Sequence, residues 1–391
     1  MKAWKSDPFR LSFKLAIIFL SIIAGSAFYF HSAIILRDRI SHTTTTSTAR
    51  SDSAPTTLFM SSLSNSWIPT RCKALLDPEA LCQSTPQMAK DVDFGRAVID
   101  KWNSDVKQMK TANHYNEHGS ETRLFHYVDP TDRKTMYGHL VRTRKTAPND
   151  EQGPGILFFH TGAGPHDISL LWKADLLACN SDVFPDGCVI LVADILSDDV
   201  GWGWSSDRTK YNEARTSVLQ AKDKSGTRPL LQSRIHAALQ SLKGAAPEVD
   251  MNRFSAMGWC LGGHSILEIG RMKISGIKAM VTFHGVFDGL RPPAAGNTRD
   301  VTNDCTPDIL ICNGQLDPFV DQTTVLQYAI DTLEQLGHKV RLLNLEGAKH
   351  GFSNPAQDYN PNESFRYNEG AAEAAWSEAV SHLKETFFKF Q

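Results

Sequence analysis

Short apolar runs alternate with amphipathic stretches along the chain from residue 121 onward. Runs of this length predict strands, whereas apolar positions recurring every three or four residues predict helices. Strands of near-continuous Val, Ile, Leu and Phe are typical of a parallel sheet that is buried on both faces. We expect such strands at residues 155–160, 188–195, 253–259, 277–285, 308–314 and 339–347.

The remaining pattern completes an α/β fold. Residues 121–128 and 134–144 flank the turn sequence DPTDR and predict an antiparallel hairpin. Amphipathic helices are expected at 325–336, just before Gly337, and at 372–387. Alternating strands and helices of this kind build a mostly parallel sheet with helices on both faces. We therefore predict one domain over residues 85–391.

Residues 196–230 interrupt the alternation. They are polar, charged and without clear periodicity, and they open with the sequence DDVGWGWSSD from residue 198. A loop of this length inside a compact domain is usually functional or disordered. Trp202 and Trp204 either hang over a substrate or pack back on their own loop.

The N-terminus has the pattern of a membrane-insertion signal. Four basic residues precede an uncharged apolar run at residues 15–36, and roughly 20 such residues span a bilayer. One interpretation of residues 1–36 is an uncleaved single-pass anchor with a cytoplasmic N-terminus. The other is a signal peptide that is cleaved before Phe28. Both place the protein in the secretory pathway or at a membrane.

Residues 37–84 form a Ser/Thr-rich linker or a transit-like segment, because their first part has no periodicity and few apolar side chains. The junction GSAF, ending at Phe28, resembles the two-part plastid presequences of algae with complex plastids. That resemblance implies a plastid location as the alternative to the secretory pathway.

The charge of the chain excludes one class of partner, and its cysteines allow two local disulfides. With 41 basic and 43 acidic residues, and no dense basic tract outside the N-terminus, the chain lacks the charge pattern of a nucleic-acid-binding protein. Local disulfides between Cys72 and Cys82 or between Cys179 and Cys188 are conceivable in a lumenal protein, but buried free thiols are commoner. We expect no cofactor and no metal ion.

The sequence GWCLGG, which ends at Gly263, follows a predicted strand and opens a predicted helix. Glycines two residues before and after Cys260 suit a nucleophile held on a sharp strand-to-helix turn, where larger side chains would collide. An unassisted thiol is only a few per cent thiolate at neutral pH. The N-terminus of the following helix and a histidine would favour the thiolate.

A carboxylate and a histidine follow in the order that this chemistry needs. Asp317 comes after the strand at 308–314, and His350 comes after the strand at 339–347. Open α/β sheets collect their functional groups at the carboxyl ends of strands. We expect His350 to exchange the proton of Cys260, and Asp317 to hold the His350 tautomer.

An oxyanion hole would complete the site. The amide of Leu261 is one expected donor, and Thr161 or Gly162, in the loop after the strand at 155–160, supplies the second. Other side chains close to strand ends or in the long insertion are possible pocket residues, although hydrogen-bonded structural histidines are commoner. They are His160, Trp202, Trp204, His284 and Asn354.

Three segments together, GWCLGG, NGQLDPFV and EGAKHGF, resemble the dienelactone hydrolase family of α/β-hydrolases, whose members use a cysteine nucleophile. The sequence ADI at 193–195 and the helical sequence ISLLWKADLLA at 168–178 support the resemblance, which covers residues 155–391. It implies that Cys260, Asp317 and His350 form the triad. It also implies hydrolysis of a small ester or lactone through an acyl-enzyme, as in a carboxymethylenebutenolidase.

The sequence departs from the family pattern at two places. Members that act on dienelactone carry an arginine shortly after the histidine, where this chain has Asn354. A glutamate often found after the third strand is missing, and His160 stands near that position. The alternative function is a catalytically silent α/β-hydrolase that acts as a binding protein. A redox role ranks lower because the chain has no C-x-x-C pair.

Overall fold

A nine-stranded sheet forms the centre of the described part of the computed structural model, in the order β1-β2-β3-β5-β4-β6-β7-β8-β9. Strands β1, β2, β3 and β5 pair antiparallel, and the series from β5 through β4 to β9 is parallel. The strands are β1 (Ile68–Pro69), β2 (Ser120–Val128), β3 (Thr135–Thr143), β4 (Gly153–Phe159), β5 (Val189–Ala193), β6 (Val249–Trp259), β7 (Ile277–Phe283), β8 (Asp308–Gly314) and β9 (Lys339–Leu345).

The structure describes residues 66–73, 75–79, 92–144, 153–197, 209–224, 226–287 and 306–388. The chain divides into two units, Met1–Asp52 and Ser53–Gln391, and all described residues belong to the second. The predicted hydrophobic segment at residues 15–36 lies outside the described residues. Among the helices that are described, none combines the length and apolar character needed to cross a bilayer.

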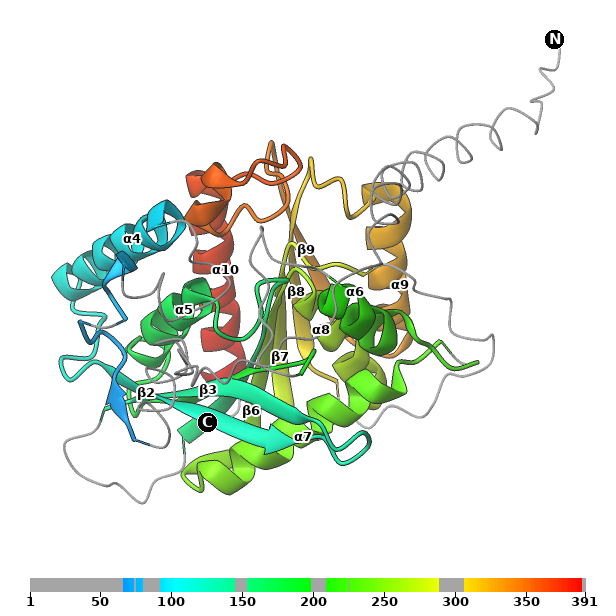
Figure 1. The fold of residues 1–391 in the computed structure, drawn as a ribbon, viewed down its shortest axis with the longest axis horizontal. Coiled ribbons are helices and arrows are strands. Elements are labelled where there is room, and N and C mark those ends of the chain that lie inside the picture. The colour runs from blue at the N-terminus through cyan, green and yellow to red at the C-terminus, as the bar shows by residue number, and fades with distance from the viewer. Residues whose placement is uncertain are drawn as a thin grey trace, which may run out of the picture. The chain divides into compact units, whose positions relative to one another are not determined.

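Helices cover both faces of the sheet (Figure 1). On one face lie α4 (Val92–Thr111), α5 (Ile168–Ala178) and α10 (Glu369–Phe388), and on the other lie α7 (Pro229–Ala245), α8 (Gly262–Met272) and α9 (Gln327–Gln335). Along β4, Ile156 and Phe158 pack toward the first set, whereas Leu157 and Phe159 pack toward the second. This period of two explains why the strand is apolar at every position.

The predicted α/β-hydrolase arrangement is confirmed, with corrections at the N-terminal side. Strand β1 pairs with Glu121 and Thr122 of β2, so the segment assigned to the linker contributes to the sheet before residue 85. A two-residue strand has no periodicity that a sequence pattern could reveal. Helix α4 is not among the predicted helices, although the buried residues Phe94, Val98, Trp102 and Val106 repeat every four residues along it.

The prediction of an irregular segment at 196–230 is wrong over its centre. Residues Thr209–Arg215 form helix α6, and a π-helical turn, η1, continues from Thr216 to Gln220. Helix α6 has no fully buried side chain. Only Tyr211 and Ala214 pack against the core, and two apolar residues are too few to mark an amphipathic helix in the sequence. Trp202 and Trp204 lie outside the described residues.

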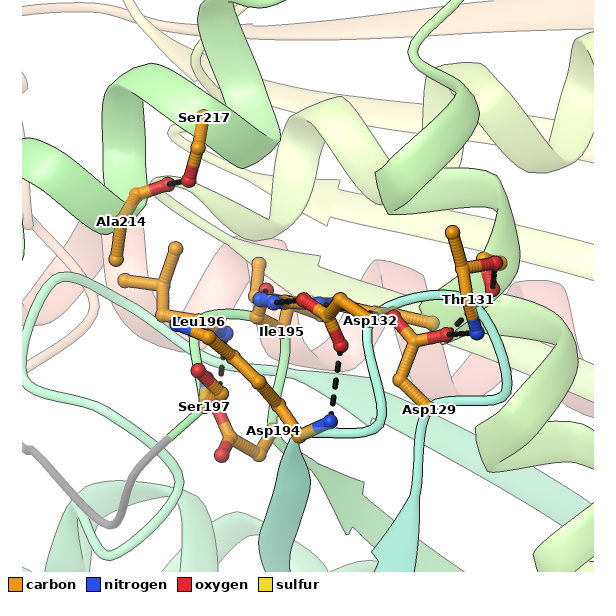
Figure 2. A network of polar contacts seen from close by, with 12 residues as sticks. Asp129, Thr131, Asp132, Asp194, Ile195, Leu196, Ser197, Ala214 and Ser217 are labelled. Carbon is orange, nitrogen blue, oxygen red and sulfur yellow. Dashed lines mark hydrogen bonds and ion pairs between the residues drawn. The ribbon is translucent and has the colours of Figure 1, made fainter.

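A buried arginine of α7, Arg234, connects the β2–β3 turn to the end of β5. Figure 2 shows Asp129 and Asp132 of that turn in the same polar network as Asp194 and Ile195. The Arg234 guanidinium contacts Asp129 at 3.3 Å and Asp132 at 2.8 Å, and it donates to the carbonyl of Ile195 at 2.8 Å. The Asp194 carboxylate accepts the backbone N–H groups of the next loop residues, Leu196 and Ser197. These bonds set the direction in which the chain leaves β5.

The described cysteines are free thiols: Cys72, Cys179, Cys188, Cys260 and Cys312. Cys179 and Cys188 are fully buried, and burial raises the pKa of both thiols. Buried thiols with a raised pKa are inert. Cys82 and Cys305 lie outside the described residues.

Lys173 of α5 is a buried lysine with an unusual environment. Its Nζ lies 3.5 Å from the ring centre of Trp172 and 4.6 Å from that of Trp376. Burial lowers the pKa of Lys173 to about 7, against 10.5 for an exposed lysine. Between these two pH values the unfolded chain binds a proton that the folded chain does not.

We therefore expect the free energy of unfolding to rise with pH from about 7 to about 10.5 and the variant Lys173→Met to weaken that dependence. At pH 7 the variant should unfold at a midpoint about 5 °C higher or more, because it avoids burying an ammonium group. Thermal unfolding at several pH values measures this, with the exposed Lys243→Met as control. The unfolding midpoint of the wild type could instead change with pH no more than that of Lys173→Met. That result would show that the indole rings keep the ammonium group charged.

Candidate active site

Cys260 stands on the turn between β6 and α8, with a backbone φ of +52°. This left-handed conformation is uncommon for a residue other than glycine and marks local strain. A Cβ on Gly258 would come 2.5 Å from the carbonyl oxygen of Gly262, and a Cβ on Gly262 would come 2.5 Å from that of Phe159. Only glycines fit at these two places, as the elbow pattern predicts.

The structure brings the three predicted side chains into one hydrogen-bonded chain. His350 Nε2 lies 3.1 Å from Cys260 Sγ, and His350 Nδ1 lies 2.7 Å from Asp317 Oδ2. The other carboxylate oxygen of Asp317 accepts the backbone N–H of Phe319 at 2.9 Å. Cys260, Asp317 and His350 follow β6, β8 and β9, so parallel strands place all three at one edge of the sheet.

His350 is enclosed by aromatic rings. The rings of Phe319, Phe365 and His284 surround it edge-on, with centroid distances of 4.9, 5.1 and 4.8 Å. Burial alone would lower the pKa of His350, but the charge of a Cys260 thiolate and the bonds to Asp317 and Cys260 raise it to about 10. The arrangement therefore favours the protonated, imidazolium form of His350.

The loop after β4 is oriented by His160. His160 Nδ1 contacts the Thr161 carbonyl oxygen at 2.6 Å, and Nε2 accepts the backbone N–H of Ile195 at 3.1 Å. Since a trans peptide directs its C=O and N–H to opposite sides, the Gly162 N–H points away from His160. Neither this amide nor that of Leu261 has a partner within the described residues.

Asp167 holds the same loop from its far end. Thr161 Oγ1 donates to Asp167 Oδ2 at 3.2 Å and accepts the backbone N–H of Ala163 at 3.0 Å. The other carboxylate oxygen of Asp167 accepts the backbone N–H of Ser169 and so caps α5. Burial raises the pKa of Asp167, against the effect of these hydrogen bonds. The turn that carries Gly162 is thus fixed at both ends.

A cavity of about 510 Å³ opens over Cys260, and we call it the catalytic cavity. Of the predicted site residues, Cys260, Leu261, Thr161, Gly162, His284, His350 and Asn354 line it. Asn354 Oδ1 also accepts the backbone N–H of Ala356 and caps the short helix η4 (Pro355–Tyr359). His160, named as a possible pocket residue, is not among the lining residues; it is the hydrogen-bonded structural histidine that was the alternative, since both ring nitrogens contact backbone and its side chain is fully buried.

Helix α6 supplies a wall of the catalytic cavity that the sequence did not reveal. Tyr211, Asn212 and Arg215 all line it. The Tyr211 hydroxyl would come 3.1 Å from a Cβ on Gly162, so α6 packs directly over the loop after β4. Arg215 is the one lysine or arginine among the described lining residues. Within the described part, no group of three or more His, Cys, Asp and Glu is placed to hold a metal ion.

Comparison with known sequences identifies the family of this chain. The sequence model of the dienelactone hydrolase family matches residues 141–387, which is more than half of the 391-residue chain. The chain belongs to the dienelactone hydrolase family. Family and fold together assign this dienelactone hydrolase relative to the hydrolases, and its matched region contains every strand from β4 to β9.

Three individual relatives show how far the similarity extends. The dienelactone hydrolase-like promiscuous phosphotriesterase P91, from metagenomic libraries, is 26% identical with a TM-score of 0.54, over 68% of this chain and 99% of P91. A solved protein named m3DLH is 24% identical with a TM-score of 0.55 over 68% of this chain and 99% of its own, and supports the fold. The Caenorhabditis elegans uncharacterized protein K02A2.1 is 27% identical over 157 residues, which are 40% of this chain and 94% of that protein.

Proposed function

We propose that this dienelactone hydrolase family member cleaves small carboxylic esters or lactones through a thioester on Cys260. The observation that carries the proposal is the chain of contacts from Cys260 through His350 to Asp317, in which Cys260 and His350 line the catalytic cavity. A nucleophile, a base and a group that orients the base, each within hydrogen-bond distance of the next, are the requirements of covalent acyl transfer.

The first half of the reaction starts from the Cys260 thiolate paired with the His350 imidazolium. The Cys260 sulfur attacks the carbonyl carbon of the ester, and the carbonyl oxygen becomes an oxyanion. The N–H groups of Leu261 and Gly162, which have no partner among the described residues, can donate to it. As the carbon–oxygen bond breaks, the His350 imidazolium gives its Nε2 proton to the leaving alkoxide, and the thioester forms.

The second half restores the enzyme. Neutral His350 accepts a proton from water, and the water oxygen attacks the thioester carbon. The C–S bond then breaks, which returns the Cys260 thiolate and the His350 imidazolium. Asp317 stabilises the imidazolium through Nδ1 in both halves. With Asn354 in place of the family's arginine, a substrate carboxylate has no charged partner at that position.

The direct test is to trap the thioester. We expect a p-nitrophenyl ester such as the acetate or butyrate to release a burst of nitrophenol, and the quenched protein to gain the acyl mass on the peptide that contains Cys260. The control is protein whose Cys260 has been alkylated beforehand. A binding protein without catalytic activity would bind the ester but release no burst and acquire no adduct, which would contradict the proposal.

A further inference from the structure

A second, smaller cavity lies next to the catalytic cavity, and we call it the inner cavity. Its volume is about 20 Å³, and its lining residues Thr161, His284, Gly351, Asn354 and Gln357 also line the catalytic cavity. Room for a single water requires roughly 10–15 Å³ of such space together with two to four polar partners. The inner cavity therefore has the size of a site for one water molecule, and it shares five lining residues with the cavity that contains Cys260.

Polar side chains are available to hold that water. Besides the shared residues, Ser169, Lys173 and Ser353 line the inner cavity. Ser353 Oγ lies 3.0 Å from His284 Nε2. The other ring nitrogen of His284, Nδ1, is buried and has no hydrogen-bond partner within the described residues. A buried polar atom without a protein partner costs about 1–3 kcal/mol unless water satisfies it.

The backbone conformation, ring contacts and pKa of His284 also fit a role in the reaction. It follows β7 with a φ of +40°, a strained conformation for a histidine. Its ring packs against His350 with 4.8 Å between centroids and against Phe352 with 5.4 Å. Burial and the neighbouring His350 hold the pKa of His284 well below its usual range, so the ring is neutral. A neutral imidazole can hold a water without competing with His350 for the proton.

We propose that His284 and Ser353 hold a water in the inner cavity and deliver it to the thioester, so that His284 is a positioning residue for deacylation. This inference rests on the proposed function. In the step it describes, a bond forms between the water oxygen and the thioester carbon while the C–S bond breaks. The water proton goes to His350 Nε2, and the electron pair of the broken bond stays on sulfur.

The test compares the two halves of the reaction in His284→Phe, which keeps a ring beside His350 but removes both nitrogens. We expect the nitrophenol burst to keep its amplitude and its rate within about threefold, whereas steady-state turnover falls by roughly 10–100-fold. Ser353→Ala should also lower the ratio of steady-state turnover to burst rate, by a smaller factor. His382→Phe removes a buried histidine of α10 outside both cavities and should leave the ratio unchanged.

Competition with hydroxylamine separates water delivery from a general loss of structure. Hydroxylamine reaches the thioester through the catalytic cavity, so His284→Phe should favour hydroxamate over carboxylic acid by about tenfold relative to wild type. An unchanged product ratio, or equal losses of burst and turnover in both variants, would overturn the inference. A wild-type protein that forms no adduct on Cys260 would instead overturn the proposed function on which it rests.

Discussion

Replacing Cys260 with alanine is expected to lower kcat/KM for an activated ester by about 10⁴-fold and to abolish the nitrophenol burst. The reason is that alanine provides no atom to form the thioester, whereas His350 and the oxyanion amides remain to give a small residual rate. Steady-state kinetics and intact-mass measurement of the quenched protein check the two parts of this expectation.

Cys312→Ala is the matched control. Cys312 lies on β8, is fully buried, and does not line the catalytic cavity. Its removal should cost about 1 kcal/mol of stability and leave the burst and turnover close to those of wild type. If ester cleavage persisted at the wild-type rate in Cys260→Ala, a different nucleophile would be responsible and the thioester mechanism would fail.

The second large effect is expected for His350→Gln, in which the imidazole is lost while the side chain keeps a polar end. We expect kcat/KM to fall by about 10³-fold. The rate of Cys260 alkylation by iodoacetamide at pH 7 should fall by about tenfold, because an unassisted thiol with a pKa near 8.5 is only a few per cent thiolate there.

The pH dependence of the wild-type reaction tests the same interaction between His350 and Cys260. His350 keeps its proton until the pH approaches its pKa of about 10. Above that value it can no longer protonate the alkoxide that leaves from an alkyl ester, so acylation by an alkyl ester should decline on the basic side near pH 10. Alkylation of His350→Gln should instead rise with pH along a curve centred near 8.5. Identical alkylation profiles for wild type and variant would contradict the ion pair.

Much of the catalytic arrangement was predictable because it depends on periodicity and chain order. Asp317 and His350 each follow a recognisable apolar strand, and parallel strands carry their C-terminal residues to one edge of the sheet. The glycines on either side of Cys260 could be interpreted locally, since steric crowding at a sharp turn involves only neighbouring residues and the adjacent strand. No information about distant packing was needed for either inference.

The errors, and the alternative left open at His160, depend on contacts that join distant parts of the chain. His160 has the same strand-end position as a pocket histidine, but bonds to Thr161 and Ile195 turn it into the core. Strand β1 is defined by pairing with β2 about 50 residues later. Helix α6 contains only two core-facing apolar residues, Tyr211 and Ala214, and only its position against Gly162 makes Tyr211 and Arg215 part of the catalytic cavity.

By itself, the sequence determined the fold class, the elbow at Cys260 and the order of nucleophile, carboxylate and histidine, because each follows from local pattern and the geometry of parallel strands. Tertiary structure alone decided the distances within the triad, the wall formed by α6, and the inner cavity that His284 and Ser353 help to line. A cavity is enclosed by side chains from separate elements, so its shape depends on how those elements pack and not on any one segment.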